Sequence, residues 1–250
     1  MQKTKILLGI IATLVIAFIG FRIFQQEVIA DYIRPIILPL VTLYYIIEGY
    51  NRKSYFFLFL AVYAFADLFG FFNQMAEESE LVDSLMYFGC NTLYILAYIF
   101  LIMEVYQSMN LSKILSRFLV HIVILFLLDI YCVILVSEVA IKSENLVTIY
   151  DHIIEIAYNS VIMIMLTVTL INYLYRDSKK AMNLLLGALC IVFSEVFQVA
   201  YFYVSEINVL SIAYSVLLVV AFTFFYIQVK MSYGNNEVTL SSPPIEEAKA

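Results

Sequence analysis

The sequence predicts an all-α protein: a polytopic transmembrane helix bundle with eight spans and both termini in the cytoplasm. Three observations lead to this prediction, namely the composition, the lengths of the apolar runs and the placement of the basic residues. Of the 250 residues, 64% are hydrophobic and only 14% are charged, and the mean hydropathy is +0.94. Soluble domains are about 45–50% apolar and about 25% charged, so this composition excludes a soluble domain.

Eight apolar runs are long enough to cross a membrane, since a spanning helix needs about 20 mainly apolar residues. They are too long for the strands of a transmembrane barrel and lack period-two alternation. The first run is too long for the apolar region of a signal peptide, and no small-residue cleavage site follows it. The runs cover residues 6–24, 29–49, 54–73, 82–105, 115–137, 149–174, 182–204 and 209–230.

Basic residues gather in the loops of one side, which the positive-inside rule assigns to the cytoplasm. Only Arg22 and Lys142 fall on the opposite side, and Arg34 lies within a span. This asymmetry places both termini in the cytoplasm, requires an even number of spans and indicates a cell-membrane protein. The cytoplasmic basic residues are Lys3, Lys5, Arg52, Lys53, Lys113, Arg117, Arg176, Lys179, Lys180, Lys230 and Lys249. The acidic residues of the opposite loops are Glu77, Glu78, Glu80, Asp83, Glu138, Glu144 and Glu206.

The helix bundle is expected to occupy residues 1–230. Residues 231–250 are polar and contain Pro243-Pro244, so they are expected to form a disordered cytoplasmic tail. The net charge of −6, without a basic run, argues against a nucleic-acid partner. The three cysteines lie in apolar runs without metal-ligand spacing, and we predict packing roles for them, with no metal and no cofactor.

A polar layer crosses the predicted bundle in its outer half. Ionisable side chains within spans are costly and are functional by default. With a rise of 1.5 Å per residue, six polar side chains from six spans reach nearly the same depth. They are Arg34, Asp67, Asp129, Glu155, Glu195 and Tyr214. Helical spacing and depth add Asn91, Tyr94, Tyr158, Asn159 and Gln198 to these faces.

The second span carries the most distinctive local sequence, Asp31-Tyr-Ile-Arg34-Pro35-Ile-Ile-Leu-Pro39. Each proline removes an N–H and displaces the carbonyl four residues earlier. A kinked helix with freed carbonyls beside an arginine is interpreted as a contact for a ligand headgroup. The alternative is that Arg34 only neutralises Asp67 or Glu195, or extends outward to the membrane surface.

An internal echo links the third and seventh spans. Phe65-Ala66-Asp67-Leu68-Phe69 matches Phe193-Ser194-Glu195-Val196-Phe197 as Phe, small, acidic, aliphatic, Phe. Because these two spans run parallel, the echo suggests duplicated four-helix halves related by an axis along the membrane normal.

Segments of this sequence resemble the YhhN family, the lysoplasmalogenase-like eight-span membrane proteins. The likeness covers most of the chain from the second span to the eighth. It is carried by RPIILPL, FADLFGFF, FGCNTLYILAYI and GALCIVFSEVFQ, together with Tyr158 and Ala213-Tyr214. The chain departs from the family pattern at five places. Arg34 replaces a lysine, Ala66 precedes Asp67 where the family has glycine, Glu195 replaces an aspartate, Tyr98 replaces a histidine, and Leu217-Leu218 replaces Ala-Gln.

The resemblance implies hydrolysis of the vinyl-ether bond of a lysolipid. Two carboxylates suit this chemistry, because one can deliver a proton while the other stabilises the resulting cation and orients water. We predict Asp67 and Glu195 as the catalytic pair and a membrane lipid or lysolipid as the substrate. The predicted substrate-binding residues are Arg34, which would hold the phosphate, and Asn91, Tyr94, Glu155, Tyr158, Asn159, Gln198 and Tyr214.

Other functions stay open at this point. Acidic residues on facing helices also form proton relays, so a non-catalytic lipid-binding protein or a proton-coupled small-molecule transporter is an alternative, as is a receptor-like sensor. The spans contain few glycines and only the second is broken by proline, which gives alternating access little support. A retinal pigment of the usual form is excluded because no span carries a central lysine. A homo-oligomer in the lipid bilayer also remains open.

Overall fold

The computed structural model describes residues 2–75, 80–142 and 148–231, and in this part of the chain the regular secondary structure is all helical, with no strand. Eight helices follow one another: α1 (Gln2–Ile23), α2 (Glu27–Ile47), α3 (Tyr55–Met75), α4 (Glu80–Gln107), α5 (Leu111–Ile141), α6 (Ile149–Arg176), α7 (Lys179–Tyr203) and α8 (Asn208–Val229). The all-α prediction is confirmed, and each predicted span coincides with one helix. The expected tail after Met231 lies outside the described residues, as do Glu77, Glu78 and Glu144.

Seven of the described helices are long and apolar enough to cross a membrane. The stretch Tyr55–Phe71 of α3 is also apolar. These helices fit a multi-pass membrane protein.

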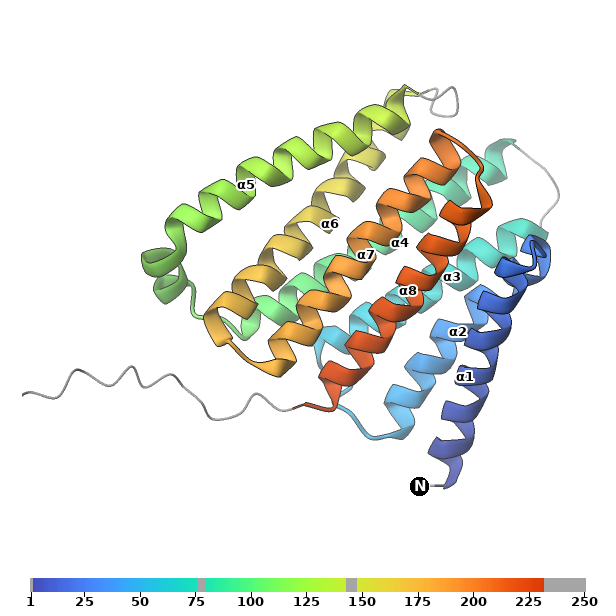
Figure 1. Cartoon of the computed structure of the whole chain (residues 1–250), viewed down its shortest axis with the longest axis horizontal. Coiled ribbons are helices and arrows are strands. Elements are labelled where there is room, and N and C mark those ends of the chain that lie inside the picture. The colour runs from blue at the N-terminus through green and yellow to red at the C-terminus, as the bar shows by residue number, and fades with distance from the viewer. Residues whose placement is uncertain (1, 76–79, 143–147, 232–250) are drawn as a thin grey trace, which may run out of the picture.

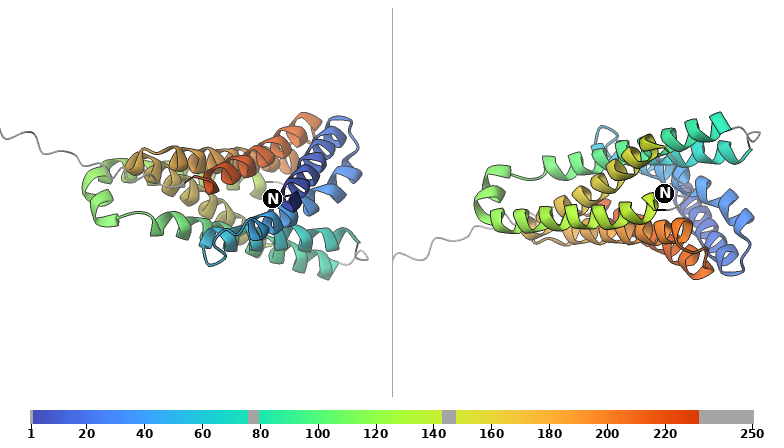
Figure 2. Two further views of the ribbon diagram at one scale, coloured as in Figure 1. Left: turned by 90° about the horizontal axis from the view of Figure 1, so that it is seen from below. Right: turned by 90° about the horizontal axis from the view of Figure 1, so that it is seen from above.

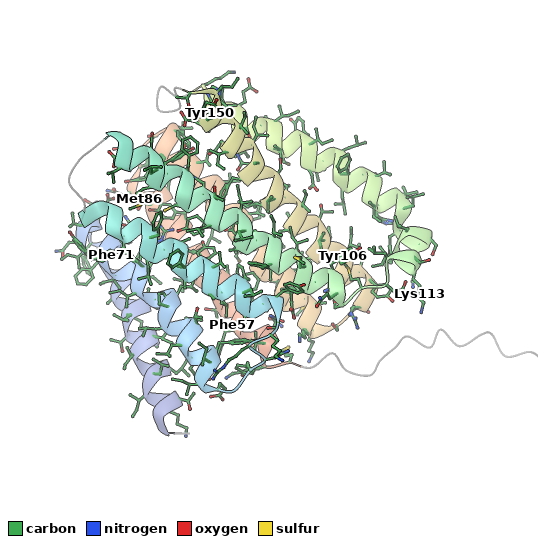
Figure 3. The ribbon with its side chains drawn as sticks, turned by 180° about the vertical axis from the view of Figure 1, so that it is seen from behind. Phe57, Phe71, Met86, Tyr106, Lys113 and Tyr150 are labelled. Atoms are coloured by element: carbon green, nitrogen blue, oxygen red, sulfur yellow. The ribbon has the colours of Figure 1, made fainter. Side chains whose placement is uncertain are left out.

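Seven helices form a closed ring, and the eighth lies outside it (Figures 1 and 2). Around the ring the order is α1, α2, α3, α4, α6, α7 and α8, and α8 returns to α1. In both views of Figure 2, α7 and α8 lie on one side, α3 and α4 on the other, and α1 with α2 at one end. Helix α5 packs outside this ring against α6 and α7.

The position of α5 does not fit the two equivalent four-helix halves that the motif shared by the third and seventh spans suggests. Helix α1 belongs to the ring, whereas α5, its counterpart in the second half, does not contact α4 in the described structure. The backbone leaves helical geometry at Phe118, with φ −118° and ψ 16°, and this kink turns α5 away from α4. Asp129 on α5 therefore faces α6, where it accepts a hydrogen bond from Thr167 Oγ1 at 2.7 Å.

The beginning of α1 and the end of α8 lie at the same end of the bundle (Figure 1), as antiparallel neighbours joined by short loops require. Arg52 and Lys53 of the α2–α3 loop and Lys179 at the start of α7 also lie at this end. We refer to it below as the basic end.

An aromatic cluster fills the bundle on the basic-end side of the predicted polar layer. It consists of Phe56, Phe59, Tyr63, Tyr98, Phe222 and Phe225. The rings of the other five lie 5.6–6.5 Å from the ring of Phe59, which is completely buried. Phe59 precedes Asp67 by eight residues of α3, or about 12 Å along the helix. The bundle therefore has an apolar, tightly packed half beneath the acidic side chains.

Close packing of α7 against α8 predicts a stability effect at Gly187. A Cβ atom built there would clash with Cε1 of Phe225, whose ring is only 1% exposed and cannot move freely. We expect Gly187→Ala to destabilise the protein by about 1–3 kcal/mol, as overpacking does. Thermal unfolding in detergent measures the effect. Gly20→Ala is the matched control, because no atom lies within 4 Å of its added methyl group, and an equal loss there would contradict the packing argument.

Candidate functional site

Two adjoining cavities lie in the half of the bundle away from the basic end. The first, here called the arginine cavity, has a volume of about 210 Å³ and is lined by side chains of α2, α3, α4, α6 and α7. The second, here called the acidic cavity, has a volume of about 360 Å³ and lies among α3, α4, α6 and α7. Both are lined by Gly70, Tyr94, Tyr158, Glu195 and Gln198. They are therefore two compartments of one polar region inside the ring.

Asp67 on α3 lines the arginine cavity. Its side chain is buried, with 8% exposure, although it follows the apolar face of α3 that carries Phe59 and Tyr63. The Tyr94 hydroxyl donates a hydrogen bond of 2.7 Å to Oδ1 of Asp67. This contact fixes one carboxylate oxygen, while the residue still borders the cavity.

Glu195 on α7 lines both cavities and is buried to the same degree as Asp67, with 8% exposure. The Tyr98 hydroxyl donates a hydrogen bond of 3.1 Å to its Oε1, and Tyr158 lies beside the same carboxylate. Tyr94 and Tyr98 are four residues apart on one face of α4. Helix α4 thus supplies one orienting hydroxyl to each of the two acidic residues.

Arg34 on α2 lines the arginine cavity together with both carboxylates. Its strongest charged neighbour is Asp67. However, no nitrogen of Arg34 lies within 4.0 Å of an acidic oxygen, and none donates a hydrogen bond within the described residues. Arg34 therefore neighbours Asp67 without a direct ion pair in the described structure, and the alternative that it serves to neutralise this carboxylate stays open.

Five of the other predicted binding residues also line the cavities. Tyr94, Tyr158 and Gln198 line both compartments, and Asn91 and Glu155 line the acidic one. Asn91 is held by a hydrogen bond from its Nδ2 to the carbonyl of Tyr87, at 2.9 Å. Eight members of the predicted polar layer therefore line one or both of the two adjoining cavities.

Two predicted binding residues lie outside both cavities. Asn159 faces α5, where its Nδ2 donates to Ser137 Oγ at 3.2 Å; the same nitrogen also donates to Glu155 Oε1 of its own helix at 3.1 Å. Tyr214 is buried, and its ring lies 5.7 Å from the guanidinium carbon of Arg22 on α1 and 5.9 Å from the ring of Tyr201 on α7. Both share the depth of the site, but their side chains belong to helix–helix contacts. Asp129 is separated in the same way, because it lies on α5 outside the ring.

Sequence reasoning overlooked several residues of the site. Tyr63 lines the arginine cavity, and Tyr87 and Tyr203 line the acidic one. A signal for Tyr63 existed, because it lies one helical turn before Asp67. Arg22, expected in an outer loop, is instead buried in α1 with 4% exposure and forms an ion pair with Asp31 of α2. The ion pair with Asp31 explains the difference, because it compensates the charge of Arg22 and allows this side chain to lie within the bundle.

The acidic cavity extends toward the helix ends opposite the basic end. It is lined by Asp83 near the start of α4 and by Tyr203, the last residue of α7. Tyr203 follows Glu195 by eight residues, or about 12 Å of helix. Within the described ranges, no group of three or more His, Cys, Asp or Glu side chains could hold a metal ion. The site thus combines two oriented carboxylates, an arginine and several hydroxyl groups, which suits acid–base chemistry on an anionic ligand.

In comparisons with known proteins, the chain matches no protein-family model, no curated protein and no solved structure. Its fold and composition define the class, a multi-pass helical membrane protein. Anything more specific has to be argued from the site.

Proposed function

We propose that this protein is an eight-span membrane hydrolase that cleaves the vinyl-ether bond of a lysolipid, in the manner of lysoplasmalogenases. The protein would lie in the cell membrane with both termini in the cytoplasm, because the basic loops lie at the same end of the bundle as the start of α1 and the end of α8. The proposal combines the sequence resemblance to the YhhN family with the arrangement of the site. The observation that carries it is that Asp67, Glu195 and Arg34 line one cavity.

The reaction requires protonation and hydration in sequence. A carboxylic acid donates its proton to the alkenyl carbon that is not bonded to oxygen, and the electrons of the double bond form the new C–H bond. The oxocarbenium ion that results is attacked by water, whose proton passes to a carboxylate. The hemiacetal then breaks its C–O bond to give an aldehyde and a glycerophospho alcohol, with the proton moving to the leaving oxygen. Asp67 and Glu195 supply the acid and the carboxylate.

Arg34 would hold the phosphate of the lysolipid. A guanidinium presents several donors in a planar arrangement that matches phosphate oxygens. Arg34 suits this role because it borders the cavity and forms no ion pair with any residue that the structure describes. The headgroup would occupy the polar cavities, while the single alkenyl chain would lie between helices and extend toward the surrounding bilayer.

The decisive experiment incubates the purified protein with lysolipids that differ only in the bond at the first glycerol carbon. We expect a free aldehyde from the vinyl-ether lysolipid and none from the acyl ester or the saturated alkyl ether. An aldehyde-specific hydrazine reagent with mass spectrometry measures the product. If the vinyl-ether lysolipid binds but yields no aldehyde, the protein is a lipid-binding relative without this activity, and the proposal is wrong.

A proton-coupled transporter fits the structure less well. A transport path has to continue from the cavities to the basic end, where the aromatic cluster fills the ring. The residues at the centre of that cluster, Phe59 and Phe225, are at most 1% exposed. The hydrolase proposal needs access from one side only, which the acidic cavity is placed to provide.

A further inference from the structure

Arg22 occupies a buried junction between three helices. It lies in the last turn of α1, and its Nη2 forms an ion pair with Asp31 Oδ1 of α2. Its Nη1 donates a hydrogen bond of 3.2 Å to Ser211 Oγ of α8. The guanidinium carbon also lies 5.7 Å from the centre of the Tyr214 ring. Arg22 does not line either cavity, so its charge acts through the residues that it contacts.

Asp31, the ion-pair partner of Arg22, lies between two arginines. It precedes Arg34 by three residues on α2, so both side chains lie on one face of the helix. Both line the arginine cavity, and Arg34 is a charged neighbour of Asp31. The carboxylate of Asp31 nevertheless pairs with Arg22, and Arg34 forms no ion pair in the described structure.

We propose that Arg22 is a positioning residue for ligand binding. By engaging Asp31, it prevents this carboxylate from pairing with Arg34 and leaves the Arg34 guanidinium available to a phosphate group. This inference rests on the proposed role of Arg34 as the phosphate-binding residue.

The physical basis is a competition for one cation. The Asp31 side chain is 35% exposed, so the loss of Arg22 leaves a partly buried carboxylate at the cavity wall, and this carboxylate is attracted to the nearest remaining cation. In a chain without the Arg22 charge, that cation is Arg34, one helical turn away. An internal Asp31–Arg34 pair would then have to be broken before an anionic ligand could bind, and affinity would fall by the free energy of that pair. Ligands without a phosphate would not be affected.

The test measures binding rather than hydrolysis, so it is independent of catalysis. The probe is a radiolabelled saturated alkyl-ether lysophosphoethanolamine, which lacks the vinyl bond. Binding to the full chain in maltoside micelles is followed by scintillation proximity. We expect Arg22→Gln to weaken binding by about tenfold, equivalent to about 1.4 kcal/mol. Binding of a matched alkylglycerol without phosphate should change by less than about twofold, which corresponds to under 0.5 kcal/mol.

The double variant with Asp31→Asn separates positioning from folding. Removing the Asp31 charge leaves nothing to compete for Arg34, so Arg22→Gln with Asp31→Asn should regain most of the lost affinity for the phosphate probe. Lys142→Gln is the matched loss of a cation, because Lys142 pairs with Glu138 at 2.5 Å on the exposed end of α5. It should bind the probe like the wild-type protein.

Three results would overturn the inference. They are unchanged binding in Arg22→Gln, a double variant that binds as weakly as Arg22→Gln alone, and a wild-type protein that does not bind the phosphate probe. If Arg22→Gln does not fold, Arg22→Lys takes its place, with a smaller loss that Asp31→Asn must again reverse. Failure to detect aldehyde in the hydrolysis assay would leave these binding results standing.

Discussion

Replacing Asp67 with Asn is expected to lower aldehyde release from a vinyl-ether lysolipid by about 10²–10⁴-fold, the usual contribution of a positioned acid or base. The amide cannot deliver or accept the proton, but it has nearly the volume of the carboxyl group. Its oxygen can still accept the hydrogen bond that Tyr94 donates to Asp67 Oδ1 at 2.7 Å. The fold and the cavity should therefore survive, and kcat should fall far more than binding of the saturated alkyl-ether analogue.

Asp129→Asn is the matched control for this substitution. Asp129 is buried to 7% exposure, similar to Asp67, and it also accepts a hydrogen bond from a hydroxyl group, that of Thr167. It lies on α5 outside the ring and lines neither cavity. Its variant should retain full turnover. Retained turnover in Asp67→Asn, or equal losses in both variants, would remove Asp67 from the chemistry.

Replacing Glu195 with Gln is expected to reduce turnover to a similar extent, by about 10²–10⁴-fold. The amide oxygen can keep the hydrogen bond from Tyr98, so the change is confined to the charge and the proton. The pH dependence of kcat/KM distinguishes the two carboxyl groups. In the wild-type protein the rate should fall at both low and high pH, because one group must be ionised and the other protonated. Each single variant should lose one of the two limbs.

Glu104→Gln serves as the control for Glu195. Glu104 lies near the end of α4, where its Oε2 accepts a hydrogen bond of 3.2 Å from the backbone N–H of Phe56. The amide can preserve that contact, so turnover and its pH profile should stay unchanged. If Glu195→Gln behaves like Glu104→Gln, Glu195 has no part in the proton transfers.

The sequence was sufficient to predict the helices and the depth of the polar residues. Length and hydropathy fix where each helix runs, and the constant rise per residue gives the height of a side chain. Asp67, Glu195 and Arg34 were placed at one level by this reasoning, and the structure brings them to one cavity. Depth does not specify which way a residue faces around the ring. Tyr214 and Asn159 share the level of the site but point into helix contacts.

The neighbours of each helix were harder to predict, because they depend on tertiary packing rather than on local periodicity. The internal echo between α3 and α7 suggested equivalent halves, but the kink at Phe118 carries α5 outside the ring. The pairing of Arg22 with Asp31 joins two helices across a loop, and a count of basic residues by loop assigned Arg22 to the membrane surface. Such pairs become visible only once the helices are packed.

The aromatic cluster beneath the cavities has a consequence for the cell that would carry this protein. In a lipid bilayer, water that entered from the side of Asp83 would meet closely packed rings before it reached the lysines and arginines of the other face. At the centre of this barrier, the rings of Phe59 and Phe225 carry no polar group and are at most 1% exposed. A hydrolase with this arrangement could be present in many copies without letting ions leak down the gradients that the membrane maintains.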